Sequence, residues 1–265
     1  MAETDDFLLT GVLHLPALPG APASVGGFQS VVDHALRDAE ALFEGGIHSC
    51  VIENFGDSPF RAGVVQPHVP AMLAVIAAEV HRRFSGELQV GINVLRNDAH
   101  SALGAAVACG ASFIRVNVLT GAAWTDQGLI QGQADAVLRY RRALCGPESG
   151  PKIMADVRVK HAIPAGETDL SRLAIEAVER GGADGVILTG QGTGLPTEID
   201  DVRIVRAAVP SHPVWVGSGV RVQTVRALVG LADGAIVGTC LHRDGQIEAE
   251  IDENRVRSLV EAARS

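Results

Sequence analysis

The chain alternates between two kinds of apolar pattern, and this alternation limits its possible folds more than any other feature. Short apolar runs typical of buried strands are Leu8–Leu13, Ser49–Ile52, Gln89–Leu95, Phe113–Val118, Ile153–Val157, Gly185–Leu188, Val214–Val216 and Ala235–Val237. Stretches with helical spacing of apolar residues separate them: Phe28–Phe43, His68–Phe84, Ala99–Cys109, Gln131–Leu144, Leu170–Arg180, Asp201–Ala208, Val222–Val229 and Asp252–Ala263. This order predicts an α/β fold with a parallel sheet that helices cover.

Eight strand–helix units without a visible domain break favour a single (β/α)8 TIM barrel formed by residues 1–265. The alternative is an open doubly wound sheet, which usually has fewer units and a Gly-x-Gly-x-x-Gly motif after its first strand; that motif is absent. A weak internal repeat supports the barrel. Four similar segments end, at their eighth residue, in Glu53, Asn117, Thr189 and Gly238. The other interpretation of the repeat is a shared signal that stops a helix and starts a strand.

Composition narrows the classes of function. The chain has 22 basic and 31 acidic residues, a net charge of −9 and only 4% aromatic residues, which disfavours nucleic acid and anionic lipid as partners. No apolar run approaches the roughly 20 residues that span a bilayer. The acidic N-terminus lacks the pattern of a signal peptide, so we expect a cytoplasmic protein. The widely spaced Cys50, Cys109, Cys145 and Cys240 are interpreted as core residues in a reducing compartment.

The segments that follow the strands are mostly longer than those that precede them, and in a barrel these loops build the active face. Two turns rich in glycine and hydroxyl groups end the last two strands: Gly217, Ser218 and Gly219 in one, and Gly238 and Thr239 in the other. Backbone N–H groups in such turns converge on anions, so they predict a phosphate site. The alternative is two ordinary tight turns.

Two strand ends carry candidate catalytic groups. Glu53 directly follows buried apolar residues and needs a partner or a function; it is a candidate general base or acid, or else forms a salt bridge with Arg115 or Lys160. Strand alternation predicts that Asp156 and Lys160 share a face, which brings Lys160 to the mouth of the barrel. Lys160 is one of only two lysines, and we expect it to contact a substrate oxyanion or phosphate, with a Schiff base as the minor variant. The alternative is a solvated loop lysine.

His14 closes the first strand and is the fourth catalytic candidate, the alternative being a core histidine. The predicted substrate-binding residues are Asn93, Arg115, Asn117, Asp126, His161 and Thr189. The loop 124–128 is interpreted as a lid or a contact of a homo-oligomer, and residues 96–98 as a helix cap. No cofactor is evident from the sequence, although Glu53 and Asp156 together would suit Mg²⁺.

Several motifs occur in an order that resembles the BtpA/SgcQ family along nearly the whole chain. They are GVLHLPALPGAP, VIENFGDSPF, GINVLRNDA, IRVNV, TDQG, ADVRVKHA, ADGVILTGQGTG, VGSGV and ADGAIVGT. The resemblance implies a TIM-type barrel related to ribulose-phosphate-binding barrels. The family takes its name from a role in photosystem I accumulation in cyanobacteria, and other members look like sugar-utilisation proteins.

Two functions are therefore expected. The first is an enzyme that acts on a phosphorylated sugar or nucleotide by isomerisation, C–C bond cleavage or chemistry at a glycosyl bond. The second, suggested by the family's name, is a non-catalytic ligand-binding or assembly factor of the BtpA type. A scaffold has no need of polar residues at so many strand ends, so the sequence favours the enzyme.

Overall fold

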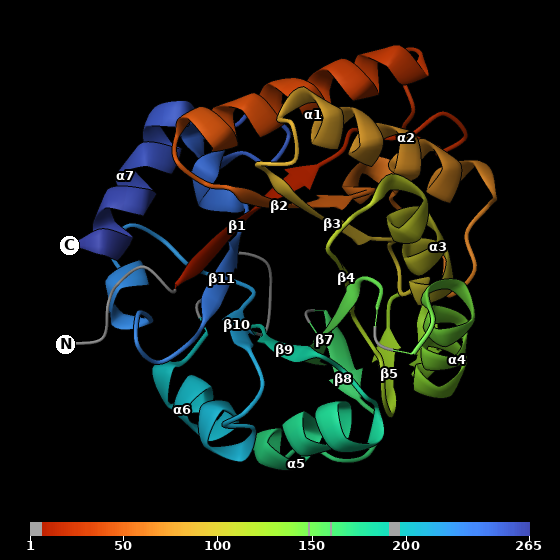
Figure 1. Ribbon diagram of the computed structural model, residues 1–265, viewed down its shortest axis with the longest axis vertical. Coiled ribbons are helices and arrows are strands. Elements are labelled where there is room, and N and C mark those ends of the chain that lie inside the picture. Colours follow the sequence, from red (N-terminus) through yellow and green to blue (C-terminus); the bar gives the residue numbers. More distant parts are fainter. Residues whose placement is uncertain (1–6, 148, 160, 191–196) are drawn as a thin grey trace.

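The computed structural model describes residues 7–147, 149–159, 161–190 and 197–265. Parallel strands close into a barrel whose neighbours follow the order β1-β11-β10-β9-β7-β4-β3-β2 (Figure 1). The barrel strands are β1 (Leu8–His14), β2 (Ser49–Glu53), β3 (Gln89–Asn93), β4 (Phe113–Val116), β7 (Lys152–Arg158), β9 (Gly185–Leu188), β10 (Val214–Val216) and β11 (Gly234–Val237). The predicted α/β class and the predicted (β/α)8 barrel are confirmed.

Helices form a ring around the strands (Figure 1). They are α1 (Phe28–Glu44), α2 (His68–Arg83), α3 (Ala99–Cys109), α4 (Ala134–Cys145), α5 (Leu170–Ile175), α6 (Ile199–Ala208) and α7 (Glu253–Arg264). A π-helical turn over Glu176–Arg180 continues α5. The buried residues of α1 include Val31, Ala35 and Leu42, whose spacing places them on one side of the helix. This side packs so closely on β1 that a Cβ at Gly11 would lie 2.4 Å from a methyl group of Leu42.

The core of the barrel has two parts, which the sheet separates. The larger one fills the space between the strands and the helices. The smaller one lies inside the barrel and consists of Val12, Val51, Phe113, Met154, Ile187, Trp215 and Ile236. The rings of Phe113 and Trp215 meet edge to face, with centroids 5.4 Å apart. Large side chains therefore fill the barrel below its C-terminal end, so a ligand can enter only at that end.

The expected helix over Val222–Val229 was wrong. A single short 3-10 turn at Val225–Ala227 occupies this segment. The hydroxyl of Thr224 accepts a hydrogen bond from the backbone N–H of Arg221 and donates one to its carbonyl. Such local side-chain bonds compete with the helical pattern, so the segment folds as turns.

The long loop after β4 contains strands that the sequence analysis did not predict. Strands β5 (Ala122–Thr125) and β6 (Gly128–Gln131) form a hairpin, and β8 (Ala162–Pro164) pairs with the other edge of β5. Ala123 and Ile130 on one face of this small sheet are buried. On the other face Trp124 lies between its cross-strand partners Leu129 and Ile163, and all three side chains are exposed. A homo-oligomer contact through this loop stays a prediction.

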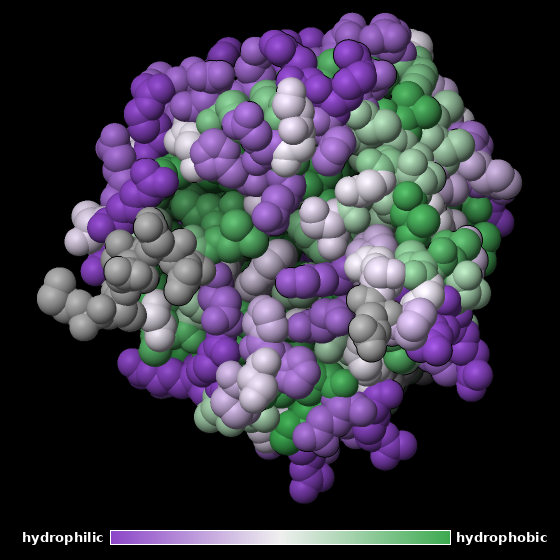
Figure 2. All heavy atoms as spheres, in the orientation of Figure 1, coloured by the Kyte–Doolittle hydropathy of each residue, from purple (hydrophilic) through white to green (hydrophobic). Residues whose placement is uncertain are grey.

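Hydrophilic residues cover much of the face shown in Figure 2, whereas apolar residues gather over the side of α2 and α3. Outward-facing residues there include Val75 and Val107, which are partly exposed. Within the described residues, no helix is long and apolar enough to cross a membrane.

We predict that Gly91→Ala destabilises the barrel. A Cβ at Gly91 would lie 2.2 Å from the ring of Phe113, which the closed barrel holds in place, and overpacking of this kind costs roughly 1–3 kcal/mol. Gly104→Ala on α3 is the matched control, because its Cβ would lie 3.3 Å from the terminal hydroxyl of Tyr140. Alanine favours a helix by about 1 kcal/mol over glycine, so this variant should be as stable as the wild type or more stable. Urea unfolding measures both, and equal loss in the two variants would contradict the packing argument.

Candidate functional site

Polar residues and glycines follow the inner apolar layer on every strand of the barrel. Side chains of a strand alternate between its two faces, so the residue two positions beyond an inward-facing one also faces inward in a regular strand. The residues at these positions are His14, Glu53, Asn93, Arg115, Asp156, Thr189, Gly217 and Gly238. The sequence analysis had named all eight as candidates.

A cavity of about 420 Å³ opens at this end of the barrel. The predicted residues that line it are His14, Glu53, Asn93, Arg115, Asn117, His161, Gly217, Ser218, Gly219, Gly238 and Thr239. The predicted residues Asp156, Thr189 and Asp126 are not among its lining residues. Thr189 is buried and donates its hydroxyl to the carbonyl of Arg158, so it braces the neighbouring strand. Asp126 lies at the exposed tip of the hairpin formed by β5 and β6.

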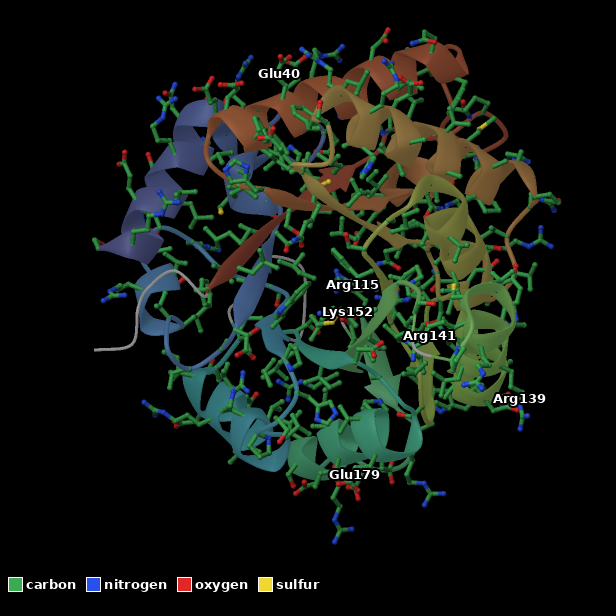
Figure 3. The ribbon with its side chains drawn as sticks, viewed as in Figure 1. Glu40, Arg115, Arg139, Arg141, Lys152 and Glu179 are labelled. Atoms are coloured by element: carbon green, nitrogen blue, oxygen red, sulfur yellow. The ribbon has the colours of Figure 1, made fainter. Side chains whose placement is uncertain are left out.

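Arg115 is at the centre of the site and lies near the middle of the ring of strands, unlike Glu40 and Arg139 on the outer helices (Figure 3). Its Nε and Nη2 each lie 3.1 Å from a different carboxylate oxygen of Asp156, and its Nη1 lies 3.1 Å from Oε1 of Glu53. The side chains of Arg115, Glu53 and Asp156 are 6%, 8% and 0% exposed. Burial alone would lower the pKa of Arg115, but the two carboxylates raise it above its ordinary value. Arg115 is therefore a permanent cation shared by two acids.

Two amides complete this ion network. The Nδ2 of Asn93 donates to Oε1 of Glu53 over 3.0 Å, and the Nδ2 of Asn117 donates to Oδ2 of Asp156 over 2.9 Å. The Oδ1 of Asn117 is buried and has no hydrogen-bond partner among the described residues. Asn93 and Arg115 both bond Oε1 of Glu53, and within the described part of the chain Glu53 makes its polar contacts through this oxygen. Its Oε2 is the oxygen available to the cavity that Glu53 lines.

The Mg²⁺ hypothesis does not fit this arrangement. It required Glu53 and Asp156 to share a cation, and the guanidinium of Arg115 already bridges the two carboxylates. Elsewhere in the described residues, no group of three or more His, Cys, Asp or Glu side chains could hold a metal ion.

The glycine turns after β10 and β11 meet at one side of the cavity. Gly219 has a φ of +70°, a conformation in which glycine is unstrained. Gly238 lies against His14, because a Cβ there would be 2.6 Å from the imidazole Cε1. The Oγ of Ser218 accepts a hydrogen bond from the backbone N–H of Gly190 over 2.5 Å, which ties this turn to the end of β9.

Several cavity residues were missed as binding candidates because they lie in loops, in short turns or, for Arg255, in the first turn of α7. They are Phe55, Phe60, Arg96, Arg221, Cys240, Asp244 and Arg255. Arg221 and Arg255 place two cations beside the glycine turns. Their positive charges lower the pKa of the Cys240 thiol, whereas burial raises it. Burial nevertheless raises the pKa of the Cys240 thiol to about 11, so it stays protonated at neutral pH. All four cysteines are free thiols.

The predicted helix cap at residues 96–98 is only partly right. Asp98 caps α3, since its Oδ1 accepts a hydrogen bond from the backbone N–H of Ser101. The side chain of Asn97 instead bonds both backbone groups of Val118. Arg96 lines the cavity, and its Nη1 lies 3.5 Å from Oδ1 of Asp126. Burial lowers the pKa of Arg96, while Asp126 and Asp156 act in the opposite direction. This ion pair joins the β5–β6 hairpin to the rim of the cavity.

The expected alternation along β7 is interrupted. The pairing of β7 with β9 shifts register between Asp156 and Arg158, so simple alternation no longer decides where the following residues face. Asp156 pairs with Arg115 inside the barrel, whereas Nη2 of Arg158 lies 2.6 Å from Oδ2 of Asp201 on α6. Alternation along β7 therefore no longer predicts that Lys160 reaches the mouth of the barrel. Lys160 itself lies outside the described residues, and its contact with substrate stays a prediction.

Solved structures of other proteins share the barrel fold. KGPDC from Streptococcus mutans aligns with a TM-score of 0.62 at 11% identity, over 97% of both chains. N-(5'-phosphoribosyl)anthranilate isomerase from Pyrococcus furiosus aligns with a TM-score of 0.58 at 12% identity, over 97% of this chain and 98% of that one. At such low identity these likenesses show the barrel fold alone.

Relatives found by sequence are much more similar. The photosystem I biogenesis protein BtpA of Synechocystis sp. is 44% identical over 252 residues, which are 95% of this chain and 86% of that protein. A protein of Thermococcus kodakarensis is 44% identical over 256 residues, 97% of this chain and 95% of its own. The model of the BtpA family matches residues 6–265. The resemblance found in the motifs is thereby confirmed, and the chain belongs to the BtpA family.

Proposed function

We propose that this protein is an enzyme that binds a phosphorylated sugar or nucleotide at the C-terminal end of the barrel and moves a proton on its carbon skeleton. One observation carries this proposal. A single cavity joins the glycine turns after β10 and β11 to the side chains of Glu53 and His14. Proton transfer at carbon serves isomerisation and C–C bond cleavage, whereas a reaction at a glycosyl bond would use the same residues to pass a proton to the leaving-group atom.

The glycine turns form the phosphate end of the proposed site. Backbone N–H groups of Ser218, Gly219 and Gly238 would donate to the phosphate oxygens, and the hydroxyl of Thr239 would add a side-chain donor. The N–H of Gly217 already donates to the carbonyl of Leu188 over 2.8 Å, so Gly217 would shape the turn without bonding the phosphate. Arg221 and Arg255 line the same side of the cavity and supply positive charge, although the chain as a whole is acidic. Arginine suits phosphate because its planar group donates several hydrogen bonds at once.

Glu53 and His14 form the reactive end. They are register partners on neighbouring strands, so their side chains enter the cavity next to each other. The bonds from Arg115 and Asn93 to Oε1 fix the orientation of Glu53 and leave Oε2 to exchange a proton with substrate. Asp156 would act indirectly, because it holds Arg115 from behind the cavity wall. Asn117 lines the cavity and would support this pair by donating its amide to Asp156.

Proteins of similar fold support the choice of ligand. The isomerases from Pyrococcus furiosus and Thermococcus kodakaraensis are both named for a phosphoribosyl compound. The relative named for photosystem I biogenesis favours the second candidate function, a non-catalytic assembly factor. Turnover separates the two candidates, because an assembly factor needs no proton donor or acceptor in its cavity.

We predict that phosphorylated sugars stabilise the protein and that their dephosphorylated forms do not. A ligand at about 100 times its Kd adds about 2.7 kcal/mol of stability, which raises Tm by roughly 5–10 °C for a chain of this size. Thermal unfolding with ribose 5-phosphate, ribose and inorganic phosphate measures the effect. Equal shifts with ribose and ribose 5-phosphate would contradict a phosphate site.

The position of the phosphate is tested at Gly219. Gly219→Asp should abolish the shift, because it places a negative charge in the proposed anion site. Gly219→Asn is the matched control, since asparagine has the same shape without the charge and both residues tolerate a positive φ. If both variants respond like the wild type, the phosphate binds elsewhere.

We predict that Glu53→Gln keeps the barrel folded and lowers turnover of the bound sugar phosphate by roughly 10²–10⁴-fold, because the shape is retained and the proton transfer is lost. Exchange of substrate hydrogen with deuterium from the solvent, followed by NMR, reports proton transfer directly. Arg115 keeps both bonds to Asp156 in this variant, so the fold should survive.

Glu40→Gln on α1 is the control, since Glu40 is half exposed and pairs with Arg83 on the surface. It should exchange deuterium at the wild-type rate. If Glu53→Gln unfolds readily while each folded molecule remains fully active, Glu53 is only a partner of Arg115.

A further inference from the structure

His242 is a buried histidine that belongs to no site described so far. It follows the short 3-10 turn Thr239–Leu241 after β11, and none of it is exposed to solvent. A β-bridge between His242 and Ile251 and a hydrogen bond from the backbone N–H of Asp252 to the carbonyl of Leu241 hold this segment on the barrel. The imidazole of His242 is therefore fixed in place.

The hydrogen bonds of His242 decide which of its nitrogens carries a proton. Its Nδ1 lies 2.6 Å from the carbonyl oxygen of Ala249, and because a carbonyl can only accept, Nδ1 must donate. Burial lowers the pKa of His242, and nearby His34 lowers it further. The hydrogen bond to Ala249 and the charges of Asp38 and Glu248 raise this pKa, but their effect is smaller. His242 is thus neutral near pH 7, and its Nε2 carries a lone pair.

This lone pair faces His14. The Nε2 of His242 lies 3.1 Å from the Nδ1 of His14, so Nδ1 of His14 must carry the proton and donate it. In neutral His14 the Nε2 then carries the lone pair. The edge of the ring with Cε1 and Nε2 lies against the inner side of Gly238, in the wall of the cavity, and Phe55 packs on the ring with centroids 4.9 Å apart.

We propose that His242 is a positioning residue that holds His14 as the Nδ1–H tautomer and so presents the Nε2 of His14 to the cavity as a proton acceptor. The role of His14 as a proton acceptor rests on the proposed function. The tautomer of His14 does not depend on which substrate binds. The bond also steadies the imidazolium, because Nδ1 of His14 keeps its acceptor after Nε2 has gained a proton. Burial disfavours the charged form of His242, so passage of the proton from His14 on to His242 is unfavourable and the proton can return to the substrate.

The tautomer can be observed directly by long-range ¹H–¹⁵N NMR on histidine-labelled protein at a pH where His14 is neutral. In the wild type, Nδ1 of His14 should be protonated and Nε2 unprotonated. His242→Phe removes the acceptor, and His14 should change to the Nε2–H form or to a mixture. His242→Gln can still accept from His14 through its amide oxygen and donate to Ala249, so it should restore the wild-type tautomer at least in part.

Activity provides the second readout. His242→Phe should lower kcat by about 10–100-fold with little change in KM, the usual effect of removing such a supporting partner, and His242→Gln should recover part of the loss. His81→Gln, on the exposed last turn of α2, is the control and should match the wild type in both measurements.

The proposal is wrong if Nε2 of His14 is protonated in the wild type, or if His14 keeps the same tautomer in a folded His242→Phe variant. Should that variant fail to fold, the wild-type spectrum and His242→Gln still decide the matter. If the tautomers are as stated but no phosphorylated sugar is turned over, the proposed function fails while the role of His242 in setting the tautomer of His14 stands.

Discussion

The shared ion pair of Arg115 with Glu53 and Asp156 is the interaction on which the rest of the site depends. Buried charges are costly unless they are paired and hydrogen-bonded, and removing one partner leaves an uncompensated charge in the protein interior. Here one cation serves two carboxylates, and Asn93 and Asn117 supply the remaining donors. The network joins β2, β3, β4 and β7, so the same contacts that satisfy the charges also fix the floor of the cavity.

Around this floor the cavity has two chemically different sides. Glycine turns and arginines lie on one side. Glu53 and His14 belong to the other, and the two sides meet where Gly238 lies against His14. Arg115 holds Glu53 and His242 holds His14. In the proposed function, separate binding and reacting groups would let the binding energy of a phosphate position a sugar for chemistry elsewhere on the molecule. The histidine pair extends this support from the strands into the segment that follows β11.

Much of this could be predicted from residues near one another in the chain. Two-residue periodicity marks Glu53, Asn93 and Arg115 as the polar continuation of buried strands, and all three line the cavity. The same rule failed on β7 beyond Asp156, because the register with β9 shifts between Asp156 and Arg158. No pattern in the neighbouring residues predicts this shift. Local pattern also failed for the segment before β11, where the hydroxyl of Thr224 favours turns over the helix that apolar spacing had suggested.

The sequence by itself determined the barrel strands and most of the helices between them, the polar character of the strand ends and the membership of a family, because each of these depends on local periodicity or on motifs read in order. Only the tertiary structure decided which polar groups meet. Glu53 and Arg115 are 62 residues apart in the chain, and His14 and His242 are 228 apart. Closure of the barrel brings such residues into contact, and the register of neighbouring strands selects the pairs. That is why Glu53, which the sequence also suggested as a metal ligand, pairs with Arg115. It is also why His242, in the segment after β11, forms a hydrogen bond with His14 at the end of β1.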